Sequence, residues 1–348
     1  MKILQLKTLI FTLSTVLLSS CSTLLFTSLD VLRPAKVSFA LNANDVLIVN
    51  NTIPQPSNYG HTTELINENQ KNIILNADSL SIFCLSALAE DLENKNFFAS
   101  VQLIPNTVNK DTEFFSKNIL SDSTAKKLCN SNQANVLISL DKIAISDDLT
   151  EYYKPETGTF LPSLEMKVET NWSIHYLNKP DVIPIQFCDT IYWEYESTNR
   201  RKAMNNLPNR ADALVDGALN AGHNTVNRFI PYWDKVDRYF FNSSNKIMKQ
   251  AMDSVIVKNW QAAINLWQKV YDSSKNNWLQ AQATNNIAIA YEILGDLDKA
   301  IENATLSYYT MGKMIIVDFQ SFTRVHDYID ELNQRKSEIK ILKTQLGD

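Results

Sequence analysis

Apolar residues in the N-terminal half of the chain form short runs that are separated by stretches of helical periodicity. Residues 46–49 are all apolar, and similar runs rich in Val, Leu and Ile follow at residues 101–104 and 136–140. Runs of this length, bounded by polar residues, are typical of buried strands. Between them, residues 76–93 and 121–130 place apolar side chains at the spacing of a helix that buries one face. This order predicts an α/β domain with a parallel or mixed sheet and flanking helices.

The spacing changes after residue 160. Residues 164–176 alternate between apolar and polar side chains, and residues 184–195 form a second strand-like segment rich in aromatic residues. Alternation of this kind predicts half-buried strands. The segment Asn178–Asp181, which contains a proline, lies between them. We therefore expect an antiparallel hairpin that extends the sheet.

A helix is predicted over residues 210–228, with short side chains along one face. These residues, at spacings of four, three and four, are Ala211, Val215, Ala218 and Gly222. Side chains at such spacings share one side of a helix, so the helix is expected to lie close against the sheet. Together, residues 37–241 are predicted to form one α/β domain.

A repeated pattern in the C-terminal third predicts pairs of helices. Residues 260–271 align with residues 297–308 at a constant offset of 37. The second copy is the clearer one, with Ala288 and Ala300 where two helices would approach closely and Gly295 at the turn between them. This pattern resembles the tetratricopeptide repeat, a unit of two helices.

Residues 242–348 are therefore predicted to form an all-α, tetratricopeptide-like repeat domain. Each repeat buries its apolar face only against its neighbours, so the amphipathic segment 319–346 is expected to serve as a capping helix. Such repeats bind peptides or protein segments on the concave face formed by the first helix of each pair. The predicted outward-facing, partner-binding residues of the second copy are Gln282, Asn285, Ile289 and Glu292. The alternative is a structural repeat fragment that packs on the α/β domain.

The first 21 residues predict a bacterial lipoprotein signal peptide. Two lysines precede an apolar run at residues 9–18, and the lipobox-like sequence Leu-Ser-Ser-Cys ends at Cys21. The run fits a signal-peptide core and is shorter than the ~20 residues that span a bilayer. We expect lipidation at Cys21, which would attach the protein to a membrane, with residues 22–36 as a tether. An uncleaved anchor or an ordinary secretory signal is the alternative.

Composition and motifs argue against several classes of function. The net charge of −5 and the absence of a lysine-rich run give no basis for binding nucleic acid. The chain has 7 glycines and no phosphate-binding or dinucleotide-binding glycine motif. Its four histidines are scattered without metal-binding spacing, and no nucleophile-elbow motif is present. We therefore expect no metal, no cofactor and no enzymatic activity.

Apart from Cys21, the chain contains Cys84, Cys129 and Cys188, none in a C-x-x-C arrangement. We expect them to be buried thiols, because free cysteine behaves as a small apolar residue. One disulfide among the three is the alternative.

Several features together resemble an uncharacterised lipoprotein family of Bacteroidetes-type bacteria with C-terminal tetratricopeptide-like repeats. These features are the lipobox, Arg33-Pro34-Ala35, the 46–50 segment, the aromatic join at residues 231–241 and the repeats. The resemblance implies an envelope location and interactions mediated by the repeats, and it supplies no catalytic residues. Ser22 after the lipobox cysteine is similar to signals for the outer membrane, facing the periplasm.

The expected function is that of a membrane-tethered envelope lipoprotein, a non-enzymatic protein-interaction or assembly module that contacts an envelope protein through its helical repeats. A glycan- or nutrient-binding lipoprotein is the alternative, because tryptophans can stack on sugars. The residues that would serve this role are Trp172, Trp193, Trp260, Trp267 and Trp278.

Overall fold

The computed structural model describes residues 25–116, 118–178 and 182–347, and the chain divides into two compact units. The helical unit comprises the described residues up to Pro34 and residues 232–344. The sheet unit comprises residues 35–231 and 345–347. The predicted signal peptide and the lipidation of Cys21 lie outside the described residues. Within the described residues, no helix combines the length and the apolar composition needed to cross a membrane.

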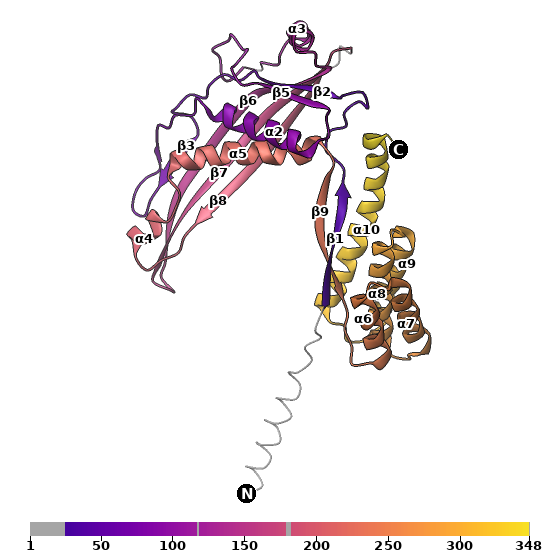
Figure 1. Ribbon diagram of the computed structural model, residues 1–348. Coiled ribbons are helices and arrows are strands. Elements are labelled where there is room, and N and C mark those ends of the chain that lie inside the picture. Colours follow the sequence, from indigo (N-terminus) through magenta and orange to yellow (C-terminus); the bar gives the residue numbers. More distant parts are fainter. Residues whose placement is uncertain (1–24, 117, 179–181, 348) are drawn as a thin grey trace. The chain divides into compact units, whose positions relative to one another are not determined.

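The sheet unit is a mixed sheet with helices on both faces, as the sequence predicts (Figure 1). Its strands are β2 (Asp45–Asn50), β3 (His61–Glu64), β4 (Lys71–Asn72), β5 (Ser100–Ile104), β6 (Val136–Lys154), β7 (Thr159–Tyr176) and β8 (Val182–Glu194). Its helices are α2 (Leu80–Lys95), α3 (Asp122–Asn132), α4 (Arg200–Asn205) and α5 (Arg210–Phe229).

Strand β6 organises this sheet because its length allows it to pair with three neighbours. Its first part pairs in parallel with β2, and a later part pairs in parallel with β3. Along its other edge it pairs antiparallel with β7, which in turn pairs with β8 in the predicted hairpin. Strands β5 and β4 add to the outer sides of β2 and β3.

The continuous apolar run of β2 is explained by burial on both faces of the sheet. Val46 and Ile48 belong to the core that includes residues of α2 and α5. Leu47 and Val49 point to the opposite face and pack with residues of α3. A strand covered on both sides has no solvent-facing positions, so it shows no alternation.

The small residues of α5 allow a close approach to the sheet, as predicted, and also to helix α2. A Cβ atom at Gly217 would lie 2.5 Å from the sulfur of Met166 on β7. A Cβ atom at Gly222 would lie 2.3 Å from the backbone oxygen of Cys84 and 2.8 Å from the Cβ of Ala87, both in α2. Ala211, at the start of the predicted stripe, is exposed. Helices α2 and α5 lie side by side across one face of the sheet (Figure 1).

The helical unit contains a two-stranded ribbon and five helices in its described part (Figure 1). The elements are β1 (Leu25–Arg33), β9 (Tyr232–Phe240), α6 (Lys246–Ile256), α7 (Trp260–Ser273), α8 (Asn277–Ile293), α9 (Leu297–Gly312) and α10 (Phe319–Leu346). The all-α region that follows the α/β domain is therefore confirmed, and α10 has the predicted bounds.

The ribbon corrects the predicted tether and the predicted edge of the α/β domain. Residues 25–33, which were expected to be a tether, pair antiparallel with residues 232–240 in continuous register. Strand β9 was assigned to the α/β domain from its position in the sequence, but it belongs to the helical unit. The pairing joins segments about 200 residues apart, so no local pattern reports it.

The three cysteines outside the signal sequence are unbonded. Cys84 and Cys129 are buried, as predicted for thiols that pack as apolar groups. Cys188 is exposed, contrary to the prediction, because its position on β8 points away from the core. The three thiols therefore differ in their access to solvent.

Native thiol labelling is expected to modify Cys188 and to spare the other two. Burial, together with the charge of Asp189, raises the pKa of Cys84 to about 12, and burial also raises the pKa of Cys129. The thiolate is the reactive form, so iodoacetamide at mildly alkaline pH should react with Cys188 alone of these three. Peptide mass spectrometry gives the extent at each site, with full labelling in concentrated guanidinium as the control. Equal native labelling of Cys84 and Cys188 would contradict the described packing.

Candidate functional site

A groove of about 540 Å³ runs between β9, α8 and α10 in the helical unit. The residues that define its chemistry are Arg238, Tyr239, Asn285, Ile289, Arg324 and Tyr328. It combines aromatic and aliphatic walls with several hydrogen-bonding groups. It is therefore the candidate binding site of this unit.

The position of β9 follows from alternation along the strand. Arg238 and Phe240 are buried, whereas Tyr239 between them is exposed. The ring of Phe240 stacks near Trp260 and Trp267, with centroid distances of 6.5 and 5.7 Å. The inward side of β9 thereby packs against the helices.

The end of β9 is fixed by a reciprocal pair of hydrogen bonds. The backbone N–H of Phe241 donates to Asn286 Oδ1 at 2.8 Å, and Asn286 Nδ2 donates to the carbonyl oxygen of Phe241 at 2.8 Å. Asn286 is fully buried in α8. These bonds satisfy backbone groups that burial would otherwise leave unpaired.

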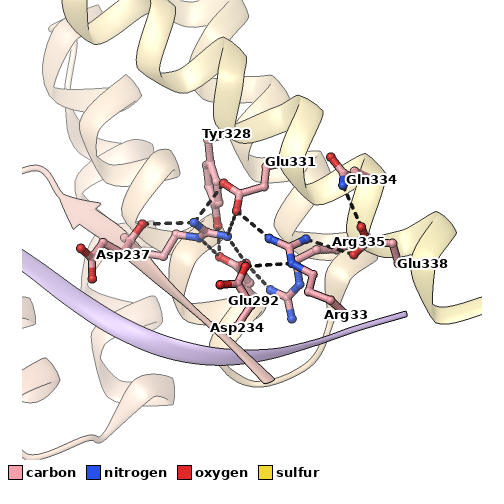
Figure 2. A network of polar contacts seen from close by, with 10 residues as sticks. Arg33, Asp234, Asp237, Glu292, Tyr328, Glu331, Gln334, Arg335 and Glu338 are labelled. Carbon is pink, nitrogen blue, oxygen red and sulfur yellow. Dashed lines mark hydrogen bonds and ion pairs between the residues drawn. The ribbon is translucent and has the colours of Figure 1, made fainter. Parts of the chain in front are cut away.

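A network of charged groups fixes Arg238 at the groove. Figure 2 shows Glu292 at its centre, with Tyr328 and Arg335 nearby. Arg238 donates to both carboxylate oxygens of Glu292, at 2.6 and 2.9 Å, and it also contacts Glu331 at 3.0 Å. Tyr328 Oη donates to Glu292 at 2.8 Å, and Arg335 forms a further ion pair with the same carboxylate. The Glu292 side chain is fully buried and that of Arg238 is 5% exposed. Such a two-pronged pair is a strong, directional form of ion pairing.

The pKa shifts in this network favour the charged form of Arg238 and the neutral form of the Tyr328 phenol. Burial acts against the charge on Arg238, but the hydrogen bonds and charge of Glu292, with a contribution from Glu331, raise the pKa of Arg238. Burial and the adjacent Glu292 carboxylate raise the pKa of Tyr328 well above its ordinary value. The phenol therefore stays protonated and serves as a hydrogen-bond donor.

Strand β1, the partner of β9 in the ribbon, joins the same network through Arg33 (Figure 2). Arg33 on β1 pairs with Asp234 on β9 at 3.2 Å. It also pairs with Glu338 at 3.0 Å and contacts Glu331 at 3.5 Å, both on α10. The ribbon is thus held on the helices by ion pairs from both strands.

The four residues predicted to face outward are buried, because the face on which they lie is covered within the helical unit. Asn285 and Ile289 line the groove, with exposed fractions of 4% and 2%. Glu292 is the partner of Arg238. Gln282 is buried and lies outside the lining of the groove. Their role in partner binding stays a prediction.

Two groups in the groove lack an evident partner among the described residues. The side-chain amide of Asn285 makes no hydrogen bond there, although the residue is almost fully buried. Arg324 makes no ion pair there, and its guanidinium lies over the ring of Tyr239 at 5.6 Å. Both groups can donate hydrogen bonds, so this part of the groove fits a ligand that carries acceptor oxygens.

Sequence reasoning missed Arg238 and Arg324. Arg238 lies in the aromatic join, where no periodicity marks one polar residue as buried. Arg324 lies on α10 outside the apolar positions of that helix, where the sequence pattern gives no sign that a charged residue lines a groove.

The polar residues of the sheet unit serve mainly to connect its elements. The Asp147 carboxylate on β6 is fully buried and is contacted by both His61 and Arg210. These contacts link β3 and the start of α5 to the long strand. In the described part of the chain, no group of three or more His, Cys, Asp or Glu residues is arranged to hold a metal ion.

Comparison with known proteins places most of the sheet unit, together with strand β9 of the helical unit, in one domain family. The sequence profile of a domain of unknown function, DUF8603, matches residues 43–241, more than half of the chain. The chain belongs to the DUF8603 family. A second domain of unknown function, DUF6340, matches residues 249–334. This DUF8603 member thus carries the groove residues of α8 and α10 in its DUF6340 segment.

No curated protein matches the sequence. Two solved structures are similar to part of this chain. One, titled as a crystal structure of an uncharacterized protein, is 10% identical, covers 54% of this chain and 95% of its own, and gives a TM-score of 0.20. The other, the hypothetical protein CT253 from Chlamydia trachomatis, is 12% identical, covers 54% and 98%, and gives a TM-score of 0.26.

Proposed function

We propose that this DUF8603 protein is a membrane-tethered, non-enzymatic interaction module whose helical unit binds a segment of an envelope protein. The groove between β9, α8 and α10 is the proposed binding surface. The observation that carries this proposal is the pair of donors in the groove, Asn285 and Arg324, without a hydrogen-bond or ion-pair partner among the described residues. Burying such donors is favourable only when an acceptor meets them.

The helix pairs are compatible with interaction repeats of the tetratricopeptide type. Helices α8 and α9 are joined by a tight turn in which Gly295 has a φ of +82°. A left-handed residue of this kind favours glycine. The ribbon of β1 and β9 occupies part of the face on which such repeats bind their ligands, so the groove beside it is the part left for a partner.

The proposed tether is a lipid on Cys21, four residues before Leu25 at the start of β1. This position would attach the helical unit to a membrane of the cell envelope, with the outer membrane facing the periplasm as the expected site. The signal-like sequence of residues 1–21 supports this location.

The chemistry of the groove favours a partner segment with an acidic residue next to an apolar one. A carboxylate can accept two parallel hydrogen bonds from the guanidinium of Arg324. The Asn285 amide can donate to a second acceptor, and Ile289 offers an apolar contact nearby. Such a segment would satisfy the donors and bury an apolar side chain together.

Glycan binding has less support than binding of a protein segment. Trp172 and Trp267 are fully buried in the two cores. Trp193, Trp260 and Trp278 are half-buried and pack against apolar clusters. Packing accounts for each of the five tryptophans proposed for stacking.

Reversing the charge of Arg324 is expected to reduce capture of the partner. A photo-crosslinking amino acid at Thr323, an exposed residue of the groove, should capture an envelope protein in intact cells when the full chain is used. Arg324→Glu should lower the yield by roughly tenfold or more, because a charge-assisted hydrogen bond contributes ~1.5–3 kcal/mol.

The matched control is Arg201→Glu, which makes the same charge change at an exposed position of the sheet unit. Its yield should equal that of the unmodified chain. Equal yields from both variants, or a loss in both, would rule out the groove as the binding surface.

A further inference from the structure

One end of the helical unit carries an unusual concentration of exposed apolar side chains. Ile315 and Ile316 are 103% and 85% exposed, the highest values among the exposed large apolar residues of the described chain. Phe319, at the start of α10, is 78% exposed, and Phe26 near the start of β1 is 69% exposed. Large apolar groups displayed together commonly mark a surface that meets an apolar partner.

These side chains gather at one end of the unit even though they come from distant parts of the chain. The ring of Phe26 lies 6.5 Å from the ring of Tyr239. Tyr239 and Phe319 line the same groove, and Ile316 precedes Phe319 by three residues. Figure 1 shows the start of β1 beside the start of α10.

The loop that presents the isoleucines is held in place. Val317 packs into an apolar cluster with Met311 and other residues of the helical unit. Asp318 accepts hydrogen bonds from the backbone N–H and the hydroxyl of Ser321, at 3.2 and 2.5 Å, in the first turn of α10. Because its neighbours are fixed, the loop cannot easily turn Ile315 and Ile316 inward.

The position of the expected lipid identifies the partner of this surface. Cys21 precedes Leu25 by four residues, and four residues span at most ~14 Å. A lipid on Cys21 would therefore bring the start of β1 within that distance of the membrane interface. Apolar side chains of interfacial segments enter the headgroup region by ~5–10 Å, so the exposed end lies within reach.

We propose that this end of the helical unit is a membrane-contacting face, in which Phe26, Ile315, Ile316 and Phe319 enter the interface of a lipid bilayer. The inference rests on the proposed tether at Cys21. The tether would keep the face near the membrane, and the side chains would fix the orientation of the unit against it. Because the face shares Phe319 with the groove, a partner segment would bind close to the membrane surface.

The test places an environment-sensitive fluorophore on the full lipidated chain in phosphatidylcholine vesicles. Ile316→Cys carries the label in a Cys188→Ser background, and Ile256→Cys, an isoleucine of the same unit that is 76% exposed and outside the face, is the matched control. Nitroxides attached to the lipids should quench the label at residue 316 at least about fivefold more than the label at residue 256. Equal, weak quenching at both positions on a vesicle-bound chain would overturn the face and leave the tether intact.

A second measurement tests the face without the lipid, and it applies if the full chain carries no lipid and does not bind vesicles. Residues 22–348, the chain without its signal and Cys21, are sedimented with the same vesicles. The expected result is weak binding that falls at least about tenfold in the Ile315→Ser/Ile316→Ser double variant, while an Ile256→Ser variant binds as the unmodified chain does. Loss of the tether with binding retained here would reject the proposed anchor and support the face. Absence of vesicle binding would reject the face.

Discussion

Replacing Glu292 with alanine is expected to lower the free energy of unfolding of the helical unit by about 3–5 kcal/mol. The carboxylate is fully buried and pairs with both Arg238 and Arg335, while Tyr328 donates to it. Its removal would leave buried cations and a buried phenol without their acceptor. This loss of stability is larger than the net contribution of the ion pair to the free energy of unfolding, because the remaining charges in the interior lose their partner.

Hydrogen exchange measured by mass spectrometry can localise this effect to α8, α10 and the ribbon. The matched control is Glu302→Ala, an exposed glutamate on α9, whose removal should change stability by less than ~0.5 kcal/mol. Glu292→Gln should lie between the two, because the amide keeps an acceptor for Tyr328 but loses the charge. A loss of less than ~1 kcal/mol in Glu292→Ala would show that the network does not hold the ribbon on the helices.

Replacing Gly222 with alanine is expected to destabilise the sheet unit by about 2–3 kcal/mol. The added methyl group would lie 2.3 Å from the carbonyl oxygen of Cys84, which is backbone and cannot rotate away. Helices α2 and α5 would have to separate, and the core between them and the sheet would lose contacts. Hydrogen exchange in peptides of α2 and α5 measures the change.

Gly312→Ala provides the opposite expectation at the last residue of α9. A Cβ atom there would meet nothing within 4 Å, and alanine restricts the unfolded chain more than glycine does. The variant should be unchanged or more stable by up to ~1 kcal/mol. If Gly222→Ala behaved like Gly312→Ala, α2 and α5 could not be packed at the described distance.

Part of the candidate site was accessible from the sequence. The repeat pattern predicts Asn285 and Ile289 on one face of α8 as partner-binding residues, and both line the groove. The pattern could not reveal that the same face is covered in part by the protein's own ribbon. Arg238 lies 54 residues from Glu292, so no local pattern connects them. A charged residue is expected to be exposed to solvent, because most charged residues in proteins are exposed.

The sequence by itself determined the classes and order of the elements. Short apolar runs and helical periodicity predicted the α/β domain and the helices after it, and α10 spans the predicted residues 319–346. These features are local, because burial of one face imposes a period on the residues of a single element. The continuous apolar run Val46–Val49 likewise predicted a buried strand, and the structure covers this strand on both faces.

Only the tertiary structure decided which elements meet and what covers each face. It pairs residues 25–33 with residues 232–240, assigns both to the helical unit and places Gly222 against a helix. It also brings Arg33, Arg238 and Glu292 into one network of ion pairs. Periodicity shows that a face is buried but carries no information about its partner, because that choice depends on contacts between residues far apart in the chain.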